Sequence, residues 1–187
     1  MTLDLAGCSD GELAALALAG RQNAYSELMR RHREPVYRLI RSHVGDADAA
    51  LDVTQQSFIA AFSALRRYDA ERPFRVWMAR IAINKARDWA RRRTVRRLFT
   101  FARPIEEAAD VADPDALADV QLADRLELER TMAAIATLPT NLKDALILRT
   151  IEGFSQSESA SVLGISEKAV EARLYRARSK LTEILRG

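Results

Sequence analysis

Long segments of helical periodicity, separated by short breaks that carry Gly or Pro, most limit what this chain can fold into. Apolar residues recur at helical spacing along these segments, and no segment alternates apolar and polar residues as a half-buried strand does. Ala, Leu, Arg and Glu are abundant, whereas the 187 residues include only 7 Gly and 5 Pro. This composition also favours helix, and we expect an all-α fold.

Capping residues suggest where the first helices begin and end. Ser9 or Asp10 can cap a short helix over residues 12–19 that ends at Gly20. A second helix is expected over residues 23–44, and Pro35 should kink or break it. Its apolar stripe consists of Leu28, Met29, Val36, Leu39 and Ile40.

The remaining helices are predicted in the same way. Asp46 caps a third helix that runs to about Arg67, and the polar loop YDAERP follows it. Pro73 suits the first turn of a fourth helix, which includes Trp77 to Arg93. Further helices are expected at about residues 117–137, 142–151, 156–163 and 167–185.

Charge is strongly patterned although the net charge is only +3. Residues 63–103 hold 13 basic and 3 acidic side chains, whereas residues 104–130 hold 2 and 9. Such a basic block is either a solvated face or the contact surface for a polyanion. Residues 100–119 contain two prolines, many acids and little periodicity. We therefore predict two small helical domains, 1–99 and 120–187, joined by a flexible, protease-sensitive acidic linker at 100–119.

Several functional classes find no support in the residues. Cys8 is the only cysteine, and no Cys/His cluster, nucleophile–base pair or Gly-rich phosphate loop is present. We expect no enzyme activity, no metal and no cofactor. His32 and His43 are interpreted as solvated or capping histidines. No apolar run is long enough to span a membrane and no signal sequence is evident, so we expect a soluble cytoplasmic protein without membrane insertion.

The segment WMARIAINKARDWARRR, residues 77–93, combines an apolar and a basic helix face. At about 100° per residue, Arg80, Asn84, Arg87 and Arg91 form one polar stripe. Trp89 falls on the apolar side as a core residue, and Trp77 falls at the border. A row of Arg with an Asn and an aromatic edge suits phosphates and unstacked bases, so the stripe favours nucleic acid over a solvated face.

The C-terminal segment predicts a helix-turn-helix. Ser155 and Glu158 fit a capping box, Gly164 ends the first helix, and Ser166 can cap the second. Val170, Leu174, Ala177 and Leu181 form the buried stripe of the second helix. Its outward side carries Lys168, Ala172, Tyr175, Arg176 and Ser179, and the early turns of this helix are expected in the major groove of DNA.

Three segments in order resemble sigma factors of the extracytoplasmic-function group, the smallest members of the bacterial sigma-70 family. LDVTQQSFIAAF (51–62) is similar to region 2.2, usually written D-x-x-Q-E-x-F. RPFRVWMARIAINKARDWARRR (72–93) is similar to regions 2.3 and 2.4, with their aromatic-Arg-x-Trp and Ile-Ala-x-Asn elements. Residues 138–181, from LPTNLK to RARSKL, are similar to region 4.2. The resemblance covers nearly the whole chain apart from the linker.

The resemblance implies a protein that binds core RNA polymerase and directs it to promoter DNA, held inactive by an anti-sigma factor. It places the polymerase contact at Asp52, Gln55 and Gln56. The polar stripe and Trp77 would recognise and melt the −10 element, with the loop 67–72 receiving a flipped base. The outward side of the second C-terminal helix would read the −35 element. Trp77 either stacks on DNA or supports the loop.

The chain departs from the family pattern at a few positions. Gln56 replaces the usual Glu of region 2.2, which reduces the charge at the polymerase contact. Ala169, Glu171 and Ala172 stand where many relatives have Thr, Lys and Ser, which suggests a distinct −35 sequence. An ordinary DNA-binding repressor or activator remains the alternative, since the C-terminal motif occurs in such proteins too. Binding to promoter DNA without polymerase would favour that alternative.

Overall fold

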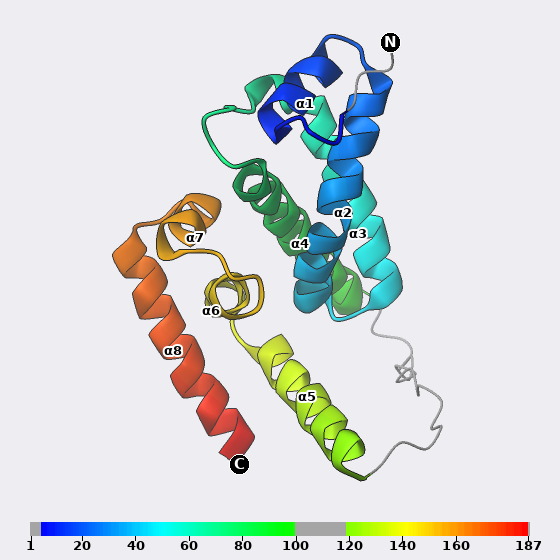
Figure 1. The fold of residues 1–187 in the computed structure, drawn as a ribbon. Coiled ribbons are helices and arrows are strands. Elements are labelled where there is room, and N and C mark those ends of the chain that lie inside the picture. Colours follow the sequence, from blue (N-terminus) through cyan, green and yellow to red (C-terminus); the bar gives the residue numbers. More distant parts are fainter. Residues whose placement is uncertain (1–4, 100–118, 187) are drawn as a thin grey trace.

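The computed structural model describes residues 5–99 and 119–186, and all regular structure within them is helical. An N-terminal unit contains α1 (Asp10–Leu18), α2 (Gln22–Val44), α3 (Ala47–Ser63), the 3-10 turn η1 (Leu65–Arg67) and α4 (Phe74–Phe99). A C-terminal unit contains α5 (Asp119–Thr137), α6 (Thr140–Leu146), the π-helical turn η2 (Ile147–Ile151), α7 (Gln156–Leu163) and α8 (Glu167–Arg186). The expected all-α architecture of two helical domains is confirmed (Figure 1). The predicted linker lies almost wholly outside the described residues.

The N-terminal unit is built on α2, which packs against α1, α3 and α4. Its fully buried side chains include Leu13, Leu28, Ile40, Phe74 and Met78. Burying a large apolar side chain contributes roughly 1.5–3 kcal/mol. This core therefore holds the exposed faces of α3 and α4 in fixed positions.

The predicted caps of α1 and α3 are present. Ser9, and not Asp10, caps α1 through a reciprocal capping box with Glu12. Asp46 caps α3 by accepting a hydrogen bond from the Ala49 backbone N–H at 2.7 Å. The prediction that the third helix reaches Arg67 as one element is wrong, since α3 ends at Ser63 and the chain tightens into η1.

Pro35 does not break the second helix, because α2 continues through it to Val44. Leu28 before the proline and Val36, Leu39 and Ile40 after it are buried. Packing on both sides outweighs the roughly 3 kcal/mol that an internal proline costs. Met29, predicted in the apolar stripe, is instead exposed.

In the C-terminal unit, α6 and α7 pack against α8. The predicted capping box of Ser155 and Glu158 is present, and Gly164 ends α7 at a φ of 66° in the left-handed region. Ser166 Oγ accepts a hydrogen bond from the Ala169 backbone N–H at 3.2 Å, as expected for the cap of α8. The helix predicted at 142–151 is regular only to Leu146, and η2 follows it.

The two units lie against each other, with α7 beside α4 and η2 near α2. Figure 1 shows α6 and α7 facing the helices of the N-terminal unit, and α8 on the far side of them. Among the described residues no helix has the length and apolarity needed to cross a lipid bilayer.

Candidate nucleic-acid interface

The outward face of α8 carries the residues predicted to read DNA. Val170 and Ala177 are fully buried, which fixes the rotation of the helix about its axis. The five residues on the opposite side are all exposed: Lys168, Ala172, Tyr175, Arg176 and Ser179. Tyr175 is 74% exposed, which is a high fraction for an aromatic residue. The helix therefore presents one basic and aromatic face with its geometry set by the core.

The polar stripe of α4 is also present, and its four residues differ in exposure and in ion pairing. Arg80, Asn84 and Arg91 are exposed, whereas the Arg87 side chain is only 28% exposed and is ion-paired with Asp144 of α6. Arg91 is ion-paired with Asp88 one turn earlier. Phe74, Met78, Ala82 and Ala86 on the opposite side are buried.

Trp77 and Trp89 are both partly buried at the edge of the core. The ring of Trp77 lies 5.3 Å from Tyr68 and 5.4 Å from Phe74, so these three aromatic residues form one cluster. Trp89 was predicted as a core residue, but it also borders a surface hollow, and the Arg93 guanidinium lies 5.2 Å from its ring centroid.

The loop 67–72 is stabilised by a hydrogen bond from its own residue Tyr68. The hydroxyl of Tyr68 donates a hydrogen bond to the Arg72 carbonyl at 2.7 Å. Burial, followed by the charges of Asp10 and Asp69, raises the pKa of Tyr68, so the phenol stays protonated and remains a donor. A hollow of about 620 Å³ lies between this loop and α1, lined by Gly11, Tyr68, Glu71 and Arg72 among others. A pocket of this kind, rimmed by polar side chains, has room for an unstacked base.

Asp52, Gln55 and Gln56 are exposed on α3, as predicted. The large apolar residues of this helix do not all face the core: Phe58 is buried, but Leu51 is 48% and Ile59 60% exposed. The buried side consists of Ala50, Val53, Thr54, Ser57, Phe58 and Ala61, which are mostly small. Ile59 stands one turn beyond Gln55 and Gln56, so the exposed stripe of α3 is polar at its centre and apolar at its margins.

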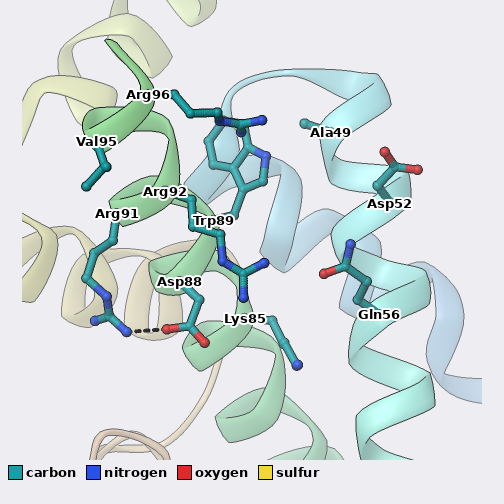
Figure 2. Close-up of a pocket in the computed structure, with 10 residues that line it drawn as sticks. All are labelled: Ala49, Asp52, Gln56, Lys85, Asp88, Trp89, Arg91, Arg92, Val95 and Arg96. Atoms are coloured by element: carbon teal, nitrogen blue, oxygen red, sulfur yellow. Dashed lines mark hydrogen bonds and ion pairs between the residues drawn. The ribbon is translucent and has the colours of Figure 1, made fainter. Parts of the chain in front are cut away.

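Asp52 lies on a ridge between two hollows. One, of about 580 Å³, separates α3 from α4 and is lined by Asp52, Gln56, Lys85, Trp89 and Arg92 among others. Figure 2 shows Asp52 and Gln56 on one wall of it and Lys85 and Arg92 reaching in from the other. The second, of about 900 Å³, lies between α3 and α2 and includes Met29, Arg33, Leu51, Asp52 and Gln55. The sequence predicted the polar residues Asp52, Gln55 and Gln56 of this ridge, but not the basic and apolar side chains beside them.

The histidines are not solvated. His32 Nε2 lies 2.8 Å from Asp10 Oδ2, and His43 Nε2 lies 2.9 Å from Asp144 Oδ1. The His43 side chain is only 6% exposed. The prediction of solvated histidines is therefore wrong at both positions, because their acidic partners are far away in the sequence. His43 also bonds the last turn of its own helix, since its Nδ1 lies 2.8 Å from the Leu39 carbonyl oxygen.

Two families match separate parts of the chain: sigma-70 region 2 over residues 28–96 and sigma-70 region 4 over residues 128–181. The chain is also 41% identical to the RNA polymerase sigma factor CnrH of Cupriavidus metallidurans, over 95% of this chain and 94% of that protein. The chain is a sigma factor of the sigma-70 family. It belongs to the extracytoplasmic-function group, and the ECF sigma factor SigM of Mycobacterium tuberculosis is 28% identical over 95% of this chain and 85% of that protein.

Solved structures agree with this membership. The sigma factor is similar to CnrH in the structure of CnrH with the cytosolic domain of CnrY, at 38% identity and a TM-score of 0.68. That match covers 94% of this chain and 96% of CnrH. The sigma factor RpoE, in complex with the anti-sigma factor NepR from Bartonella quintana, shares the fold at 20% identity and a TM-score of 0.68. Membership decides against the ordinary repressor or activator.

Proposed function

We propose that this sigma factor contacts core RNA polymerase through the α3 ridge and promoter DNA through α4 and α8. Residues 1–99 and 120–187 form the two functional domains, joined by residues 100–119. The single observation that best supports this assignment is the α8 face, where five outward residues are exposed while Val170 and Ala177 are fully buried. We place the protein in the cytoplasm, where core polymerase and promoters are.

The α3 ridge suits a protein partner. It offers one carboxylate and two amides at its centre, with exposed Leu51 and Ile59 beside them. Interfaces commonly combine apolar contact with a few charged hydrogen bonds, and an Arg of the partner can bind Asp52 in a bidentate manner. The hollows on either side of Asp52 give protruding side chains of the partner a place to enter.

The N-terminal domain suits the −10 element. Arg80, Asn84 and Arg91 lie exposed in one stripe, and the loop 67–72 with the hollow beneath it can accept a flipped base. Trp77 supports that loop through Tyr68 and Phe74 in this structure, which favours the supporting role for its ring. The α8 face, with Lys168, Ala172, Tyr175, Arg176 and Ser179, reads the −35 element.

An anti-sigma factor is the regulatory partner that we propose. The support is the similarity to CnrH, whose solved structure includes the cytosolic domain of CnrY. We propose no enzyme activity, and no cofactor is needed for the roles assigned here.

Run-off transcription with purified core polymerase on a panel of promoters tests the assignment. We expect promoter-dependent transcripts only when the sigma factor and core enzyme are both present. Tight promoter binding by the protein alone, with no polymerase-dependent transcript, would overturn the assignment.

A further inference from the structure

Asp144 of α6 is a fully buried carboxylate whose hydrogen-bond partners both come from the other domain. Its Oδ1 lies 2.9 Å from His43 Nε2 of α2. Its Oδ2 accepts hydrogen bonds from the Arg87 guanidinium of α4, one of them from Nε at 2.9 Å. The residue has an exposed fraction of 0%. A buried carboxylate without partners costs several kcal/mol, so the burial of Asp144 depends on the N-terminal domain being in place.

Arg75 makes a second contact of the same kind. Its guanidinium donates to both carboxylate oxygens of Glu158 at 2.8 Å and lies 4.6 Å from the centroid of the Phe154 ring. Glu158 also holds the capping box of α7, where Glu158 Oε2 accepts the Ser155 backbone N–H at 2.7 Å. Two arginines of α4 are therefore each bound to an acid of the C-terminal domain.

The surface of α4 that these acids occupy borders the face assigned to the −10 element and shares Arg87 with it. Arg87 belongs to the polar stripe, whereas Arg75, twelve residues earlier, lies about 120° around the helix from Arg87 and outside the stripe. Gly164 of the helix-turn-helix lies near Arg80, another member of the stripe, since a Cβ placed on Gly164 would lie 3.9 Å from Arg80 Nη2. A phosphate cannot take the Nε and Nη2 donors of Arg87 while Asp144 holds them, because the carboxylate occupies the position that a phosphate oxygen would need.

We propose that this arrangement is an autoinhibited form, in which Asp144 and Glu158 clasp the C-terminal domain onto α4, and Asp144 competes with promoter DNA for Arg87. The proposal rests on the proposed function, since it requires that the α4 stripe binds DNA. It differs from inhibition by an anti-sigma factor because both sides of the contact belong to this chain.

The distance between the two domains tests the clasp directly. Spin labels are placed on the full chain at Asn23→Cys and Thr182→Cys, two exposed positions, with Cys8→Ser to remove the native thiol. We compare the parent with Asp144→Asn plus Glu158→Gln, where the introduced glutamine can still serve the capping box of α7. A parent with Glu127→Gln plus Glu183→Gln is the matched control, since it removes two exposed acids of the same domain.

We expect one narrow distance distribution in the parent and the control, and a broad distribution in the clasp variant. The three proteins should keep the same helical content. An unchanged distribution in the clasp variant, or a parent already broad, would overturn the clasp. The measurement contains neither polymerase nor DNA, so failure of the transcription assay would leave it unaffected.

A DNA-binding experiment tests whether Asp144 competes with DNA for Arg87. The probe is a fluorescein-labelled mixed-sequence DNA with a single-stranded bubble, titrated at fixed salt. The apparent affinity scales with the open fraction, and minor states are typically populated at roughly 0.1–10%. We therefore expect the clasp variant to bind about tenfold more tightly, or better, than the control. Equal affinity of an opened clasp variant and the control would refute competition for Arg87.

Discussion

Arg31 of α2 binds the backbone near the start of the chain, although its side chain is partly exposed. Its guanidinium donates to the carbonyls of Leu5, Ala6 and Cys8 at 2.7–2.9 Å. It also bonds Glu27 at 2.8 Å. Lys cannot reproduce this fork, because an ammonium group lacks the planar set of donors.

Replacing Arg31 by Ala should lower the free energy of unfolding by about 2 kcal/mol, in the range for hydrogen bonds to a charged group. Arg31→Lys should recover only part of the loss. Arg33→Ala, an exposed site on the same helix, is the control. Thermal melting and amide exchange at residues 5–9 are the measurements, and equal melting of the two Ala variants would contradict the role given to Arg31.

Glu27 adds a pH dependence at the same place. Hydrogen bonds from Arg30 and then Arg31 lower its pKa from 4.5 to about 2. A carboxyl with a lowered pKa stabilises the fold fully above its ordinary pKa, and this contribution is lost as the pH falls through about 2. The melting temperature of Glu27→Gln should therefore lie below that of the wild type at pH 5 and converge with it near pH 2. A constant difference would rule out this linkage.

Asp52 is the residue whose change should separate polymerase binding from folding. Asp52→Arg reverses the charge on the α3 ridge and should abolish promoter-dependent transcription. Its stability should change by only about 0.5 kcal/mol, as for most surface substitutions. Glu183→Arg makes the same charge change on the far end of the molecule and should transcribe normally. Core binding is measured beside thermal melting, and normal core affinity with normal melting would remove Asp52 from the interface.

At the scale of elements, α8 carries the clearest prediction about DNA. Lys168→Ala and Arg176→Ala should weaken −35 binding while core polymerase affinity stays unchanged. A base contact should cost about 1–3 kcal/mol and relax specificity at one position, whereas a phosphate contact should reduce the salt slope by about one. Arg186→Ala, at the end of α8, is the control. Unchanged DNA affinity in both variants would mean that another face of α8 meets the DNA.

The helices themselves could be predicted because their signals are local. Caps such as Asp46 and the Ser155–Glu158 box act within four residues, and α7 was predicted with the bounds that the structure has. On α3 the larger apolar residues Leu51 and Ile59 do not mark the core face, since both are exposed. The small set from Ala50 to Ala61 repeats at helical spacing and marked the true core face, since small residues allow close helix packing.

The candidate site could be predicted only in part, because contacts between distant segments leave no local signal in the sequence. The exposed residues of α8 and the α3 ridge follow from the rotation of one helix, which its own apolar residues set. The partners of Arg87 and His43 do not, because Asp144 lies 57 and 101 residues away along the chain. Nothing in the local sequence marks such long-range pairs, so Arg87 was predicted as open to DNA.

At the scale of the whole molecule, two acids beside the domain interface should have opposite effects on stability at pH 7. Burial raises the pKa of Glu152, whose side chain is 4% exposed and whose Oε1 has no hydrogen-bond partner, although Arg38 and His43 oppose the shift. Burial also acts to raise the pKa of Glu158, but hydrogen bonds from Arg75 and Ser155 outweigh it and hold the pKa below its ordinary value.

The signs follow from linkage. The contribution of Glu158 is present above its ordinary pKa and is lost as the pH falls through the lowered one, whereas that of Glu152 is present below its ordinary pKa and is lost as the pH rises through the raised one. At pH 7, Glu152→Gln should therefore raise the melting temperature and Glu158→Gln should lower it. A change of about 1 kcal/mol corresponds to roughly 2–4 °C for a chain of this size. Shifts of the same sign would contradict the assignment.

The few polar contacts between the domains need not be strong, because both domains are on one chain. Short tethers give effective concentrations in the millimolar range, so an interface with a dissociation constant of about 0.1 mM, about 5.5 kcal/mol, is closed about nine-tenths of the time. A partner that binds either face with micromolar affinity, about 8 kcal/mol, exceeds this interface by about 3 kcal/mol. A clasp of this strength filters out weak, random encounters with DNA and yields to the polymerase, so the sigma factor would search for its enzyme before it searches for its promoter.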